Sequence, residues 1–133
     1  MITHRPGTWT PATDTTIPPL DDESQGLFED LYGFTAGLDL VLDGLRLIAL
    51  DRHTLDATNA HLAVLAGDGP SITELITRLV VRLGDSNQNP ALRDLPADRQ
   101  DAIRQLTADY AALTTESNLR QLVSETTAAI DGI

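Results

Sequence analysis

The sequence predicts an all-α fold, and three observations support that prediction. Apolar residues between positions 27 and 65 recur on a seven-residue lattice, which is typical of a helix with one buried seam. Residues that end one helix and start the next follow at positions 67–74. Apart from the brief Val80-Val81, no stretch alternates apolar and polar residues as a half-buried strand does. We therefore expect an elongated antiparallel bundle of three to four helices, with one long N-terminal helix.

The first 20 residues predict an extended or disordered N-terminal arm, because they are rich in threonine and proline and hold few apolar residues. They also lack the apolar core of a secretory signal. Trp9, the only tryptophan, is the candidate anchor of this arm, since aromatic side chains often dominate binding energy at interfaces. The expected organisation is an arm over residues 1–20 and one helical domain over residues 21–133.

The long helix is expected from Leu27 to Leu65. One lattice position holds Leu27, Phe34, Val41, Ile48, Leu55 and Leu62. At about 1.5 Å per residue such a helix is about 58 Å long, whereas a compact domain of this size has a radius of gyration of about 14 Å. Either the helix breaks between Asp51 and Asn59, where threonine, aspartate and asparagine accumulate, or the protein is elongated and associates along its length. The unbroken lattice favours association.

Glycines and polar residues on this helix are candidates for a partner interface. Gly33, Gly37 and Gly44 each cost about 1 kcal/mol in a helix interior, so either a close helix contact compensates or the helix is mildly kinked. Arg52 and Asn59 interrupt the second lattice position, where a polar residue either fixes the register of a pair or lies exposed on a frayed seam. The predicted interface comprises Trp9, Gly33, Gly37, Gly44, Arg52, Leu55, Asn59 and Leu62.

The next helix is predicted over residues 72–83. Residues 67–70, Gly-Asp-Gly-Pro, should end the long helix with a left-handed glycine and reverse the chain. Ser71 and Glu74 fit a capping box at the start of the new helix. Its apolar residues share one face and its arginines lie on the other.

The C-terminal third predicts two further helices. Residues 84–95 read as a loop with one turn after Pro90, and Pro96 suits the first position of a helix. The apolar phase then shifts across residues 114–118, which are poor helix formers. We expect a bend or break there, followed by a last helix over about residues 117–130.

Composition restricts the possible functions. Nine arginines and no lysine face 15 aspartates and 5 glutamates, giving a net charge of −11, which argues against direct nucleic-acid binding. The absence of cysteine excludes disulfides and thiolate metal sites. Asp39, Asp43 and Arg46 interrupt the most apolar window, so no membrane span is expected and the protein should be soluble and cytoplasmic. This composition is typical of a GC-rich bacterium or its phage.

No residues form a recognisable catalytic, cofactor or metal motif. His53 and His61 are eight residues apart, too far for two ligands one helical turn apart, and the Glu-x-x-His pattern of di-iron bundles is missing. The carboxylates of Asp39 and Asp43 are expected on a solvated face. We therefore expect no enzyme activity, no cofactor and no metal.

The leading hypothesis is a non-enzymatic structural or interaction protein that associates with itself or a protein partner through the long helix. Phage, plasmid-transfer and secretion assemblies contain proteins of this architecture, which is an argument by analogy. One alternative is an acidic mimic of nucleic acid that inhibits a basic DNA-binding protein. The other is a small ligand-binding helical bundle with its pocket between helices.

Overall fold

The computed structural model describes residues 17–116 and 119–132, and the chain divides into two compact units, residues 1–53 and 54–133. All regular secondary structure in the described residues is helical, which confirms the all-α prediction. Residues 17–20 of the predicted arm are not helical. The rest of that arm, Trp9 included, lies outside the described residues.

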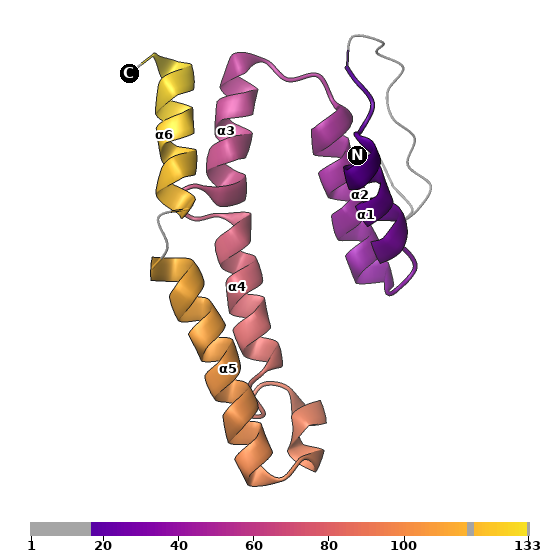
Figure 1. The fold of residues 1–133 in the computed structure, drawn as a ribbon, viewed down its shortest axis with the longest axis vertical. Helices are drawn as coiled ribbons and strands as arrows, with labels where there is room; N and C mark the ends of the chain where they lie inside the picture. The colour runs from indigo at the N-terminus through magenta and orange to yellow at the C-terminus, as the bar shows by residue number, and fades with distance from the viewer. Residues whose placement is uncertain (1–16, 117–118, 133) are drawn as a thin grey trace. The chain divides into compact units, whose positions relative to one another are not determined.

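The first unit contains a helical hairpin of α1 (Asp22–Leu31) and α2 (Ala36–Leu50) (Figure 1). Gly33 lies in the turn with a φ of 91°, a left-handed conformation that glycine adopts without steric cost. Its N–H donates to the Asp39 carboxylate at 2.9 Å, which ties the turn to the first turn of α2. The Arg46 guanidinium stacks 4.9 Å from the Phe28 ring centroid and so joins the two helices.

The predicted continuous helix from Leu27 to Leu65 is wrong, because the chain leaves the helical conformation at residues 32–35 and again at 51–54. Each break ends on a threonine that caps the next helix. The Thr35 hydroxyl accepts from the Leu38 N–H at 3.2 Å, and the Thr54 hydroxyl accepts from the Ala57 N–H at 3.1 Å. The apolar lattice runs through both breaks because it counts residues along the chain and does not depend on their conformation. The structure thus has more and shorter helices than predicted.

The second unit pairs its helices two by two. Helix α3 (Leu55–Ala66) lies beside α6 (Leu119–Asp131), and α4 (Ile72–Leu83) lies beside α5 (Ala97–Glu116), each pair antiparallel (Figure 1). The chain does not reverse at residues 67–70 as predicted, and α4 continues in the direction of α3. Gly67 has a φ of −76°, so the left-handed residue that would fold the chain back is absent there.

Several predicted boundaries in the second unit are confirmed. Helix α4 spans the predicted residues, and the Ser71 hydroxyl accepts from the Glu74 N–H at 3.2 Å as its N-cap. The turn expected after Pro90 is the 3-10 helix η1 (Pro90–Asp94). Helix α5 ends at Glu116, within the stretch where the apolar phase shifts, and α6 begins at Leu119, directly after it. Residues 117–118 lie outside the described part.

The contact between α4 and α5 is built from small residues. A Cβ added to Gly84 would lie 2.5 Å from the Thr107 methyl group and 2.6 Å from its hydroxyl. Farther along, the hydroxyls of Thr77 and Thr114 lie 3.5 Å apart. Small side chains at these positions let the two helices approach closely. Among the described residues Leu42 is the one apolar side chain that is buried, and Asp43 beside it is 2% exposed, so its predicted place on a solvated face is wrong.

Gly84→Ala should destabilise the second unit by about 1–3 kcal/mol, the usual cost of overpacking. Thr107 cannot rotate away freely, because it is β-branched and its hydroxyl donates to the carbonyls of Ile103 and Arg104. Urea unfolding measures the change. Gly69→Ala is the matched control, since nothing lies near its added Cβ. The explanation requires that Gly84→Ala cost less in a Thr107→Ala background, and an equal cost there would contradict it.

Candidate functional site

Helix α4 carries a face of large apolar side chains that is not covered. Five residues, each more than a third exposed, form this α4 stripe: Ile72, Leu75, Ile76, Leu79 and Leu83. Their exposed fractions range from 39% to 63%. Steps of three and four residues place them on one side of the helix. The sequence predicted this shared face, but the structure does not bury it against another helix of the bundle.

The opposite side of α4 makes the contact with α5, which explains why the stripe stays open. Thr77 and Gly84 face α5, and the neighbouring Val80 and Val81 are half-buried. Each helix of the pair covers only one side of the other. A helix needs a second layer to cover a second apolar face, and the described residues of this unit supply none for the stripe.

Helix α5 adds a second apolar group, the α5 patch, made of Leu106, Tyr110 and Leu113 with exposed fractions of 68%, 42% and 71%. Ile76 of the stripe and Tyr110 of the patch line the same pocket. The two groups therefore open toward the same side of the α4–α5 pair and together form one apolar surface.

The pocket between them has a volume of about 710 Å³ and is lined by α4, α5, α6 and the end of α3. Four threonines contribute to its wall: Thr73, Thr77, Thr114 and Thr115. The hydroxyl protons of the last three are donated to backbone carbonyls of their own helices. These hydroxyls can only accept from a bound molecule, so the wall suits an apolar body that carries a hydrogen-bond donor.

Arg120, at the start of α6, closes one end of this pocket and holds the turn between α3 and α4. Its guanidinium donates to the carbonyls of Gly67, Asp68 and Gly69 at 2.8, 2.9 and 2.6 Å. It also lies 3.7 Å from the Glu74 carboxylate. These contacts satisfy three successive carbonyls of the turn that follows α3.

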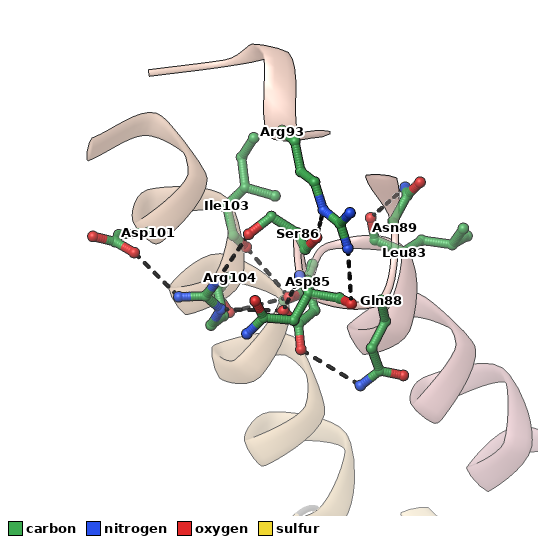
Figure 2. A network of polar contacts seen from close by, with 11 residues as sticks. Leu83, Asp85, Ser86, Gln88, Asn89, Arg93, Asp101, Ile103 and Arg104 are labelled. Carbon is green, nitrogen blue, oxygen red and sulfur yellow. Dashed lines mark hydrogen bonds and ion pairs between the residues drawn. The ribbon is translucent and has the colours of Figure 1, made fainter. Parts of the chain in front are cut away.

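A polar network fixes the loop between α4 and α5 (Figure 2). The Arg93 side chain donates to the Ser86 carbonyl at 2.9 Å, and Arg104 donates to the buried Ser86 hydroxyl at 3.0 Å. Arg104 also lies 3.5 Å from the Asp85 carboxylate. The partners in this network belong to the loop, to α5 and, through the bond from Asn89 to the Leu83 carbonyl, to the end of α4, so its role is to order the loop.

Hydrogen bonds lower the pKa of two aspartates that hold turns and helix ends. The Asn87 N–H, aided by the charge of Arg104, lowers the pKa of Asp85. Hydrogen bonds from Ser24 lower the pKa of Asp21, the N-cap of α1. Both carboxylates are therefore part of the folded structure as anions.

The three glycines of the predicted interface lie in the first unit, and the structure gives each a different position. Gly33 is in the turn before α2, so its predicted place inside a helix is wrong. Gly37 is in the first turn of α2 and Gly44 is in its middle. A Cβ on any of them would meet nothing within 4 Å. Their proposed role in a partner contact stays a prediction.

The remaining predicted interface residues fall at or after the second helix break. Arg52 lies in the link before α3, and Leu55 begins α3 and is exposed. Asn59 donates to the Asp131 carboxylate of α6 at 2.8 Å, and Leu62 is half-buried. The polar residue expected to select a partner thus contacts another helix of the same chain.

The two histidines of the described residues bond to nearby backbone. His53 donates to the Ile48 carbonyl and His61 to the Ala57 carbonyl, both at 2.7 Å. Within the described residues, no three histidine, aspartate or glutamate side chains gather as a metal site would require. None of the described helices has the length and apolar character needed to cross a membrane.

A scan against protein-family models found no match to this chain, and searches of curated proteins and of solved structures found none either. The function is therefore inferred from the residues and their arrangement in the structure. Sequence reasoning found the apolar face of α4 but missed its exposure, the pocket and the Arg120 contacts. The threonines of the two helices, such as Thr77 and Thr114, were the sequence feature that could have indicated the α4–α5 contact and the pocket wall.

Acid should weaken the loop network through Asp85. Its folded-state pKa lies below the ordinary value of 3.8, so its contribution to stability is complete above that value and is lost as the pH falls through the folded pKa. Native protein should therefore lose more unfolding free energy between about pH 5 and pH 3 than the Asp85→Asn variant does. Urea unfolding at each pH measures the difference. Equal slopes for the two proteins would contradict the assigned role.

Proposed function

We propose that this protein is a non-enzymatic interaction protein that associates with itself through the apolar surface formed by the α4 stripe and the α5 patch. The observation that supports the proposal is the exposure of eight large apolar side chains on one side of a helix pair. Contiguous apolar surface of this kind marks interaction sites in proteins. The long helix predicted from the sequence does not support self-association, because residues 27–65 form parts of three separate helices.

The size of the surface indicates how strong such an association would be. Covering the exposed half of one leucine or isoleucine contributes about 1 kcal/mol, so a pair that covers the α4 stripes of both copies gains about 10 kcal/mol. Association itself costs about 4–15 kcal/mol in lost freedom of motion. The stripe alone therefore supports weak binding, and the α5 patch is needed for a tighter complex.

The charges near the stripe also favour an interface there. The chain carries a net charge of −11, so most pairs of surfaces on two copies repel each other. Helix α4 is different, because it carries Arg78 and Arg82 and only one acid, Glu74. Two copies that meet through α4 therefore repel each other less than copies that meet through the more acidic surfaces. We propose a setting in a phage, plasmid or secretion assembly by analogy of architecture alone.

The pocket favours a second candidate function, the binding of a small amphipathic ligand. Its volume is in the range of ligand sites, and its wall combines apolar side chains with hydrogen-bond acceptors. The acidic-mimic alternative draws no comparable support. Arginine side chains engage Glu74, Asp85 and Asp101, whereas a mimic needs its acids directed at a basic partner.

Self-association should depend on the centre of the stripe. Leu79→Glu places a charge where the proposal requires contact, so it should convert a concentration-dependent dimer into a monomer, as measured by sedimentation equilibrium up to about 1 mM. Leu122→Glu on α6 is the matched control, because Leu122 is 56% exposed and Leu79 is 52% exposed. A native chain that stays monomeric over this range would overturn the proposal, and so would equal loss of association in both variants.

Ligand binding can be tested with an amphipathic fluorescent probe. Ala111→Phe places a ring in the pocket wall, so it should abolish saturable one-to-one binding of the probe, whereas Leu79→Glu, outside the wall, should preserve it. Circular dichroism checks that both variants keep their helix content. Probe binding that Leu79→Glu removes and Ala111→Phe preserves would assign the probe to the stripe and not to the pocket.

A further inference from the structure

We infer that a second copy of this chain covers the α4 stripe with its own α4, in an antiparallel register about a two-fold axis between Thr77 and Arg78. The inference rests on the proposed self-association and specifies its geometry. It starts from the spacing of the apolar residues along α4.

Four of the five residues of the α4 stripe have the same spacing read in either direction, whereas the fifth, Leu75, exchanges with Val80. Steps of four, three and four residues separate Ile72, Ile76, Leu79 and Leu83. Reversing the helix about its midpoint exchanges Ile72 with Leu83 and Ile76 with Leu79. Each of these four side chains is then replaced by another of the same volume and apolar character.

A two-fold interface requires this kind of symmetry. In such an interface the same surface is used by both copies, so residue i contacts residue j of the other copy and residue j contacts residue i. An antiparallel pair of α4 helices places Ile72 against Leu83 of the second copy and Ile76 against Leu79. All four layers are apolar, and the charged residues between them along the helix, Glu74, Arg78 and Arg82, occupy other positions of the helical turn.

The backbone dipoles favour the antiparallel over the parallel arrangement. Two parallel helices place their positive N-terminal ends together and their negative C-terminal ends together, whereas antiparallel helices place opposite ends together. The difference acts at the terminal turns of α4, which has 12 residues. In this arrangement the α4 stripe of each copy is covered by the α4 stripe of the other. No α4 stripe then stays exposed to bind a third copy.

Cross-linking of single-cysteine variants tests the register, because the native chain contains no cysteine. In the proposed pair, position 72 of one copy faces position 83 of the other. The two copies of position 72 lie about 16 Å apart along the helix axis, beyond the roughly 7 Å between Cα atoms that a disulfide spans. Ile72→Cys and Leu83→Cys should therefore cross-link when the two variants are mixed and should hardly cross-link when each is oxidised alone.

The readout is the fraction of mixed disulfides between chains that carry tags of different mass. Random pairing of equal amounts makes half of the disulfides mixed, and the proposed register makes nearly all of them mixed. Leu122→Cys mixed with Ile72→Cys measures collisional cross-linking. Circular dichroism establishes that the variants keep the native helix content.

Each other outcome overturns the inference in a recognisable way. Disulfides that form when each variant is oxidised alone would show a parallel pair. A native dimer whose mixed variants cross-link no more than the Leu122→Cys control would assign the contact to another surface, with self-association intact. A native chain that sediments as a monomer would refute both this register and the proposed function.

Discussion

Two antiparallel helices lying side by side bury only the strip between them, and this limit governs the second unit. The strip between α4 and α5 is filled by Thr77, Gly84, Thr107 and Thr114, whose small side chains bring the helices close together. The half-buried Val80 and Val81 lie beside these residues. The larger side chains of the α4 stripe and the α5 patch lie on faces that this pair does not cover.

Polar contacts connect the helices of the second unit, a role that a buried apolar core has in a larger domain. Arg120 joins α6 to the turn between α3 and α4, and Asn59 joins α3 to Asp131. At the other end of the unit, Arg93 and Arg104 hold Ser86 and the loop around it. These bonds fix how the helices are connected but cover little apolar surface. The α4 stripe and the α5 patch stay exposed in this framework.

The helices themselves could largely be predicted from the sequence, because local chemistry determines where they begin. Ser71 caps α4 at the predicted residue, and Pro90 marks the 3-10 helix. The prediction of one long helix was wrong because it was based on the seven-residue spacing of apolar residues. That spacing does not detect the turn at Gly33 or the helix cap at Thr54. A glycine and a threonine at these two positions are typical of helix ends, and they indicate the breaks that the structure contains.

The candidate surface could be predicted only in part, because packing partners are not encoded in the period of a single helix. The spacing of Ile72, Leu79 and their neighbours shows that they share a face and does not show what covers it. The Arg120 contacts have a consequence for how the unit comes apart. Because a single guanidinium spans α6 and three successive carbonyls at residues 67–69, α6 cannot detach without also releasing the joint between α3 and α4. Arg120 lies in the first turn of α6, so loss of that turn frees the three carbonyls and loosens the joint between α3 and α4.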